Sequence, residues 1–369
     1  MSRTITIRPD RFRNFGPADD GTFCLVTNPD LMEVFEIAPC EGYSDFAVVP
    51  YDQGQSFDDL LDREIPEPAH VLVVSPRCFV QSPRPDRLGP RRKLIAVPCN
   101  STPTSIEALA HFLDAVERTD PADEAAFADR FFTLGQQSAH LTFVDDQHET
   151  KAVFHHLDED YQWNQQAGAI EWGEQQIAPS GELSVLPADI MNFDPALRLA
   201  IDGEIAFKGE LAVHSGTPSF HPDDQARVYD RLSAIRNHAV IATVEQGVIT
   251  RVRPSHRGAQ PAADMFEALF EVDSRYRLIW ECGFGINRAL RLLPGNHGMN
   301  EPFGGTNGVS HWGLGLTPYT QYALIIICPG TRVLCSNGEL LVGPPEAERA
   351  DKPRGMVRRK VAGCGCYPS

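Results

Sequence analysis

Three separate segments of the chain carry a glutamate or a histidine among small residues. Glu182 follows a Pro-Ser-Gly turn, Glu281 ends an apolar run and begins a glycine-rich turn, and His311 stands in the segment Ser-His-Trp-Gly-Leu-Gly. A carboxylate at the end of a strand, followed by glycines, can be presented into a cleft with backbone close by. Carboxylates and imidazole are ligands that zinc and iron accept. The three residues are therefore candidate ligands of one metal ion.

Each of these side chains also has a structural explanation, which the spacing alone does not exclude. The first glutamate can cap a turn, Glu281 can form an ion pair with Arg288 or Arg291, and His311 can be a core histidine packed by Trp312. Two glutamates and one histidine from separate segments occur by chance in most chains of this size. The pattern becomes informative only as an ordered set.

Nucleophilic hydrolysis and nucleotide binding find no support in the sequence. Ser215, Ser310 and Cys282 lack a recognisable triad partner or nucleophile elbow. We interpret the remaining histidines, including His214, as surface or core residues. Neither a GxGxxG motif nor a P-loop occurs.

The composition limits the possible partners and the compartment. At 369 residues the chain is long enough for two domains, and its formal net charge of −17 disfavours nucleic acid and anionic membranes as partners. No apolar run approaches the roughly 20 residues that cross a bilayer, and the start of the chain lacks an apolar signal core. The nine cysteines form no pair of CxxC motifs. We therefore expect a cytoplasmic protein with free thiols.

The hydrophobic patterning predicts an α+β protein, in which an N-terminal α/β domain precedes a mostly antiparallel, barrel-like β domain. In residues 1–138, short apolar runs at 70–75 and 93–99 alternate with helical spacing over 105–118 and 122–135. Thr102 or Thr104 can serve as the N-cap of the first of these helices.

In residues 139–343, apolar runs flank turn residues, as in the hairpin expected from residues 140–156. Helices are expected only over 223–237 and 262–271. Residues 344–369 should form a polar tail, in which Cys364 and Cys366 are either redox-active, metal-binding or incidental.

The order of several short motifs carries a family resemblance. The ordered segments are Leu141-Thr142-Phe143, Pro179-Ser180-Gly181-Glu182 with Pro187, Gly203-Glu204-Ile205, Glu281 with Gly283, Gly285 and Asn287, and finally Glu301 with His311-Trp312-Gly313-Leu314-Gly315. Residues 139–330 thereby resemble the catalytic half of the M29 aminopeptidases (the aminopeptidase T group). Relatives of that family include iron-dependent dihydroxypyridine ring-cleaving dioxygenases. The resemblance implies the M29 type of fold for the second domain.

The resemblance also implies what the candidate residues do. Glu182, Glu281 and His311 match metal-ligand positions of the peptidases, and Glu281 matches an iron-ligand position of the dioxygenases. The family then expects a His-x-Asp pair, where this chain has Tyr319-Thr320-Gln321. A neutral phenol and an amide are weak ligands for zinc or ferrous iron. We therefore expect no metal cofactor. The alternative is one zinc or iron ion held by Glu182, Glu281 and His311.

The resulting hypothesis is a pseudoenzyme that binds a peptide in a metallopeptidase-like cleft. Such proteins resemble the crocagin-type peptide-binding proteins of ribosomal natural-product pathways, which present a precursor peptide to a tailoring enzyme. A peptide can join such a cleft by strand addition. The residues expected to line the cleft are Glu182, Glu281, Asn287, Arg288, His311, Trp312, Tyr319 and Gln321.

Two other functions stay open. One is a metal-dependent aminopeptidase or ring-cleaving dioxygenase with an altered Glu/Glu/His site, in which Tyr319 or Tyr322 would stabilise an oxyanion. The other is an interaction subunit without a small ligand. A homodimer is expected by analogy with the family alone.

Overall fold

The computed structural model of the protein describes residues 4–188, 197–217, 219–315, 317 and 319–345. The predicted tail, with Cys364 and Cys366, falls almost entirely outside the described residues. Both helices and strands are abundant, and the predicted α+β class is confirmed. None of the helices in the described part of the chain combines the length and apolarity needed to cross a membrane.

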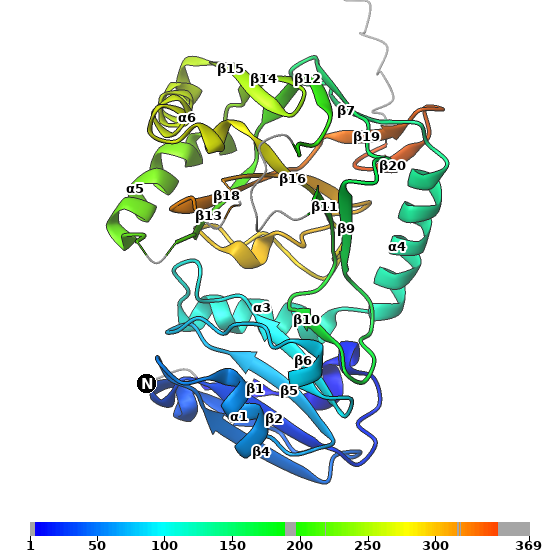
Figure 1. The fold of residues 1–369 in the computed structure, drawn as a ribbon, viewed down its shortest axis with the longest axis vertical. Helices are drawn as coiled ribbons and strands as arrows, with labels where there is room; N and C mark the ends of the chain where they lie inside the picture. Colours follow the sequence, from blue (N-terminus) through cyan, green and yellow to red (C-terminus); the bar gives the residue numbers. More distant parts are fainter. Residues whose placement is uncertain (1–3, 189–196, 218, 316, 318, 346–369) are drawn as a thin grey trace, which may run out of the picture.

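The N-terminal part is built on a parallel five-stranded sheet (Figure 1). Its strands, in spatial order, are β10 (Gln175–Ile177), β6 (Arg92–Val97), β5 (Ala69–Val74), β2 (Thr22–Thr27) and β4 (Asp45–Pro50). The central strands β2 and β5 are buried along their whole length, as parallel strands covered on both faces are. The edge strand β10 comes from far along the chain and pairs with β6.

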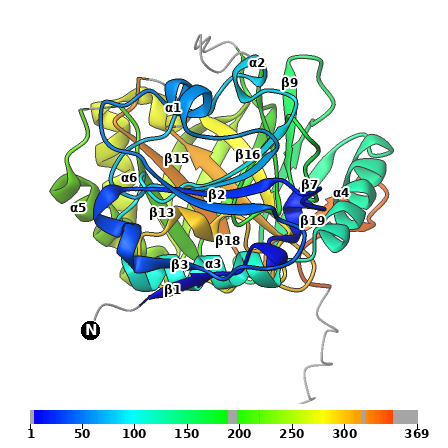
Figure 2. The ribbon, with the colours of Figure 1, turned by 90° about the horizontal axis from the view of Figure 1, so that it is seen from below.

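Helices cover both faces of this sheet. Figure 2 shows α1 (Phe57–Arg63) and α2 (Pro85–Leu88) on one side, and α3 (Ile106–Arg118) with the paired strands β1 (Ile5–Ile7) and β3 (Phe35–Ile37) on the other. The N-cap of α3 is Ser105, whose Oγ accepts a hydrogen bond from the backbone of Ala108 at 3.2 Å. The proposed caps Thr102 and Thr104 were therefore wrong.

Two antiparallel sheets make up the rest of the structure. The six-stranded sheet has the order β13 (Glu210–Ser215), β18 (Tyr322–Cys328), β17 (Val309–Leu314), β16 (Ile279–Gly285), β11 (Glu182–Pro187) and β9 (Tyr161–Gln166). The seven-stranded sheet has the order β15 (Val248–Pro254), β14 (Val240–Glu245), β12 (Ile201–Phe207), β8 (Thr150–Phe154), β7 (Leu141–Asp145), β19 (Arg332–Cys335) and β20 (Leu340–Val342). Over the described residues the two sheets are open, so the antiparallel part has no closed barrel.

A single large core fills the space between the two antiparallel sheets. It also takes in apolar residues of α4 (Pro121–Gln136), α5 (Pro222–Leu232) and α6 (Gln260–Val272). Figure 1 shows α5 and α6 together at one end of these sheets and α4 at the opposite end.

The six-stranded sheet has one apolar face and one face that carries polar residues. Leu183, Phe284, Trp312 and Ile326 belong to the face that packs into the large core. Because successive side chains of a strand point to opposite faces, their neighbours lie on the other face. That second face carries Glu182 and Ser184 from β11, Glu281 from β16 and His311 from β17. The hydrophobic pattern of the sheet therefore holds these polar residues together on one side.

Candidate functional site

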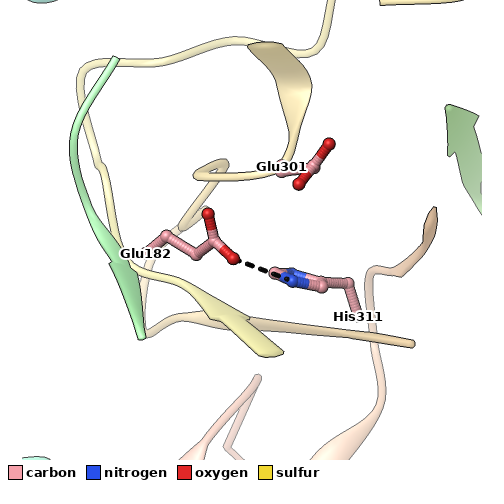
Figure 3. A group of neighbouring side chains, drawn as sticks. All are labelled: Glu182, Glu301 and His311. Carbon is pink, nitrogen blue, oxygen red and sulfur yellow. Dashed lines mark ion pairs between the residues drawn. The ribbon is translucent and has the colours of Figure 1, made fainter. Parts of the chain in front are cut away.

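Glu182, Glu301 and His311 meet at the second face of the six-stranded sheet (Figure 3). One ligand atom of each residue lies within 4.8 Å of those of the other two. Nε2 of His311 is 3.5 Å from Oε1 of Glu182, which is an ion-pair distance without a hydrogen bond. His311 is fully buried and the Glu182 side chain is only 8% exposed. Residues that are far apart in the sequence therefore form one compact group.

Strand register and two glycines create the space for this group. Glu182 pairs with Gly285 of β16, and His311 of β17 pairs with Gly283 of β16. A Cβ atom built on Gly283 would lie 1.9 Å from Nε2 of His311, so the imidazole lies directly over this glycine. The glycine-rich segment noticed in the sequence is thus a β-strand that leaves room for a ring on its surface.

Glu281 belongs to the same group. It pairs with Gly313, and a Cβ atom on that glycine would come within 2.8 Å of Oε2 of Glu281. Burial, and then the nearby charge of Glu182, raise the pKa of the Glu281 carboxyl to about 8. No ion pair between Glu281 and an arginine exists among the described residues, so pairing with Arg288 or Arg291 does not explain it.

Glu301 reaches this group from outside the sheet. It directly follows a short 3-10 helix, η8 (Gly298–Asn300), and its side chain is 17% exposed. Nε2 of His214 lies 2.5 Å from Oε1 of Glu301, and Oγ of Ser101 lies 2.8 Å from Nδ1 of His214. His214, interpreted from the sequence as a surface or core histidine, is half-buried and lies within hydrogen-bond distance of this carboxylate.

The four residues Glu182, Glu281, Glu301 and His311 are named the acidic centre. Burial by itself lowers the pKa of His311, but the carboxylates around it outweigh burial and raise the pKa to about 9. Even with Glu281 protonated, two carboxylates face one imidazolium. The acidic centre therefore keeps an excess of buried negative charge, which favours a cation as its ligand.

The acidic centre has donors that suit a divalent metal ion. Both ring nitrogens of His311 are buried and lack a hydrogen-bond partner among the described residues. A buried imidazole without partners, beside carboxylates, matches the ligand preferences of zinc, iron or manganese. Glu182, Glu301 and His311 could hold one such ion, with Glu281 beside them.

The neighbouring strand β18 offers nothing for a second ion. Its residues on the same face as His311 are apolar, because Ile327 pairs with His311 and Ile325 pairs with Gly313. Ile325 and Ile327 form a small apolar cluster with Ala212 and Val309. Among the described residues, the face therefore changes from carboxylates to aliphatic side chains at β18.

Tyr319 and Gln321 precede β18 and have other contacts. The Tyr319 ring is half-exposed and lies against the guanidinium of Arg275 at 5.6 Å. Nε2 of Gln321 donates a hydrogen bond to the backbone carbonyl of Ser219 at 2.8 Å. The positions of β18 that face His311 are instead occupied by isoleucine.

Three other predicted site residues lie away from the polar face. Trp312 packs in the large core with its ring centroid 4.6 Å from that of Phe143, so it does not pack against His311. Asn287 is buried, and its amide nitrogen donates hydrogen bonds to the carbonyl of Ser180 and to Oε1 of Glu124. Arg288 is exposed. Trp312 and Asn287 therefore support the fold around the centre.

Of the comparisons with known proteins, only the comparison with solved structures gives matches, and it bears on the fold alone. No family model and no curated protein matches the sequence. The structure is similar to that of 2,5-dihydroxypyridine dioxygenase from Pseudomonas putida KT2440, with a TM-score of 0.50 and 13% sequence identity, covering 91% of this chain and 97% of that chain. AmpT from Thermus thermophilus matches with a TM-score of 0.42 and 14% identity, covering 89% of this chain and 95% of that chain.

Proposed function

We propose that this chain is a non-catalytic peptide-binding protein, whose acidic centre holds the amino-terminal ammonium group of the peptide. The observation that carries the proposal is the composition of the polar face. Glu182 and Glu301 provide negative charge beside the carboxyl group of Glu281, whereas the adjacent positions of β18 are Ile325 and Ile327. Such a face can hold one cationic group but lacks the second set of ligands that a two-metal peptidase needs.

An ammonium group fits the donors that are present. It offers three hydrogen-bond donors and a positive charge, and the acidic centre offers carboxylate oxygens in a buried setting. The centre is reachable at the side of Glu301 and His214, whose side chains are 17% and 16% exposed. The charge of −17 over the chain also favours a cationic ligand.

The finer part of the proposal concerns the identity of the peptide. The resemblance to crocagin-type proteins supports a precursor peptide of a ribosomal natural-product pathway, held for a tailoring enzyme. That role rests on the ordered motifs of the sequence. The acidic centre supports the simpler statement, which is the binding of a peptide with a free amino terminus.

The proposal is tested with octapeptides that carry fluorescein at the carboxyl end and either a free or an acetylated amino terminus. Fluorescence anisotropy should show micromolar or tighter binding of free-amine peptides. Acetylation should weaken binding by about 10- to 100-fold, the equivalent of a charge-assisted hydrogen bond. Glu301→Gln should weaken it similarly, whereas Glu204→Gln on the surface of the other sheet should have no effect. Equal binding of both peptide forms would contradict the proposal.

A single metal ion is the second candidate occupant. The observation that favours it is the spacing of Glu182, Glu301 and His311, whose ligand atoms lie within 4.8 Å of one another. A bound divalent ion would supply Lewis-acid chemistry, as an aminopeptidase or a ring-cleaving dioxygenase requires. In this case Glu281 beside the ion would be a candidate proton acceptor.

Metal analysis of protein purified without chelators separates the two candidates. The peptide-binding proposal expects clearly less than one equivalent of zinc, iron or manganese. A stoichiometric ion that is lost in Glu301→Ala and in Glu182→Ala would support the metalloenzyme instead. Circular dichroism of both variants confirms that the loss is not caused by unfolding.

A further inference from the structure

A large hollow of about 1180 Å³ lies at one edge of the parallel sheet. Gln55, Phe79 and Asn100 line it from the loops after β4, β5 and β6, and Thr217 lines it from the segment after β13. These loops all leave the carboxyl ends of parallel strands. In the spatial order β6-β5-β2-β4, the chain runs from β2 to β4 on one side and from β5 to β6 on the other, so the connections diverge between β2 and β5. Open α/β sheets bind ligands at this edge and at such a reversal.

One buried asparagine, Asn28, links the loops that line this hollow, which is named the sheet-edge cleft. Nδ2 of Asn28 donates hydrogen bonds to the carbonyl of Tyr51 at 2.9 Å and to Oγ of Ser75 at 3.1 Å. Oδ1 of Asn28 accepts a hydrogen bond from the backbone nitrogen of Arg77 at 3.0 Å. Asn28 therefore joins the loops after β2, β4 and β5 to one another. A cleft held in this way is formed before the ligand arrives, which lowers the entropic cost of binding.

The charges of the sheet-edge cleft argue against a phosphate-bearing ligand. The two arginines in its wall already have partners, since Arg77 pairs with Asp30 at 3.2 Å and Arg84 pairs with Asp86 at 3.3 Å. Most of the other polar lining residues carry amides or hydroxyls that can both donate and accept hydrogen bonds. They include Gln53, Gln55, Gln81, Ser82, Asn100 and Ser101. Groups of this kind complement the amides of a polypeptide backbone.

An aromatic side chain stands open to solvent in the wall of the sheet-edge cleft. Phe79 is 71% exposed, which is unusual for a phenylalanine, and it follows the half-buried Cys78. Exposed aromatic residues at the centre of polar surroundings commonly anchor protein interfaces. The volume also exceeds that of most small-molecule sites, which reach about 1,000 Å³. Size, neutral hydrogen-bonding groups and an exposed ring together favour a peptide segment.

We infer that the sheet-edge cleft binds the residues that follow the amino terminus of the peptide, and that Phe79 contacts an apolar side chain among them. The inference rests on the proposed function. Ser101 in the cleft wall lies 2.8 Å from His214, and His214 lies 2.5 Å from Glu301 of the acidic centre. A peptide whose ammonium group lies at the acidic centre can therefore leave it past Ser101 into the cleft.

Two readouts test the inference with the full-length protein. The probes are free-amine octapeptides labelled at the carboxyl end, in which one position at a time is phenylalanine and the others are alanine or serine. Phe79→Ala should weaken binding of the best probe about tenfold, the effect of truncating an interface anchor. Val272→Ala is the control, because Val272 is 84% exposed and belongs to the distant helix α6. It should leave binding unchanged.

The second readout is alkylation of individual cysteines by iodoacetamide, followed by mass spectrometry. Saturating peptide should slow the alkylation of Cys78 at least several-fold. Cys40 is the internal control, because it is also half-buried but precedes β4 at the opposite edge of the sheet. Peptides that bind with equal affinity to Phe79→Ala and leave Cys78 as reactive as before would overturn this inference alone. If no free-amine peptide binds at all, the proposed function fails together with it.

Discussion

The imidazole of His311 lies directly over the backbone of Gly283. A Cβ atom added to Gly283 would be only 1.9 Å from Nε2 of His311. The two residues are paired across β17 and β16, so the contact is fixed by strand register. A glycine is therefore needed in a strand position where its conformational freedom normally costs stability. The benefit is a buried ring on the polar face, turned toward Glu182.

Gly283→Ala is expected to displace His311 and to disable the acidic centre. The new methyl group cannot be accommodated without moving the ring, and overpacking of this kind costs about 1–3 kcal/mol of unfolding free energy. Chemical denaturation measures the stability, and anisotropy measures peptide binding. Gly135→Ala in α4 is the matched control, because its nearest neighbour would be 3.9 Å away. A helical glycine replaced by alanine should leave stability unchanged or raise it by up to about 1 kcal/mol.

Glu281→Gln is expected to stabilise the ligand-free protein. Burial and the charge of Glu182 raise the pKa of Glu281 to about 8. At neutral pH the carboxyl is ionised in the unfolded chain but must take up a proton on folding, which costs free energy of folding. An uncharged amide avoids that cost, and we expect a gain of about 1–3 kcal/mol at pH 8. The gain should shrink toward pH 4.5, where the carboxyl is protonated in the unfolded chain as well. A variant less stable than the wild type at pH 8 would contradict this explanation.

The sequence predicted those elements whose burial leaves a continuous or periodic apolar pattern. β5 and β6 are short apolar runs between turns, and α3 and α6 show helical spacing. The edge strand β9 was missed, because its sequence Tyr-Gln-Trp-Asn-Gln-Gln is largely polar and only half-buried. The strand β17 was not predicted either. It is buried on both faces, and a histidine and a glycine stand at positions where an amphipathic strand would have polar surface residues.

The site was predicted in part for the same reason. Glu182, Glu281 and His311 stand beside glycines, and this local signal reflects the tight packing of the polar face. Glu301 was noticed beside the third motif, but its place depends on a loop that returns to the sheet. The partner of Glu301 is His214, which lies 87 positions earlier in the chain. No local pattern reports a contact of that separation, so only the folded structure reveals it.

The buried His70 should make the protein less stable in mild acid. Its ring is stacked on Phe15 with 4.6 Å between centroids, and Nδ1 lies 2.8 Å from the hydroxyl of Tyr43. Burial, and then the charge of Lys93, lower the pKa of His70 to about 4. The unfolded chain takes up a proton near pH 6.5, so stability is complete above that value and falls toward pH 4. The loss should approach about 3 kcal/mol, and His70→Phe should remove most of this slope in urea denaturation.

The buried Glu124 should have the opposite pH dependence. Its carboxylate accepts hydrogen bonds from the backbone of Gly168 at 3.1 Å, from Oγ of Ser180 at 2.8 Å and from Nδ2 of Asn287 at 3.2 Å. Burial nevertheless raises its pKa to about 7. The folded state then binds a proton that the unfolded chain releases near pH 4.5. The contribution to stability is therefore complete below pH 4.5 and is lost as the pH rises through 7.

Glu124→Gln separates this effect from that of other groups. The variant cannot titrate at this position, so its unfolding free energy should fall less than that of the wild type between pH 5 and 8, by about 2–3 kcal/mol. The variant should be less stable than the wild type at pH 5. Both oxygens of Glu124 accept hydrogen bonds, and the amide NH₂ of glutamine would face one set of these donors without being able to accept from them. Asp123→Asn, an exposed carboxylate in the same helix, serves as the control and should keep the wild-type slope. Equal slopes for wild type and Glu124→Gln would mean that Glu124 is already ionised throughout this range in the folded protein.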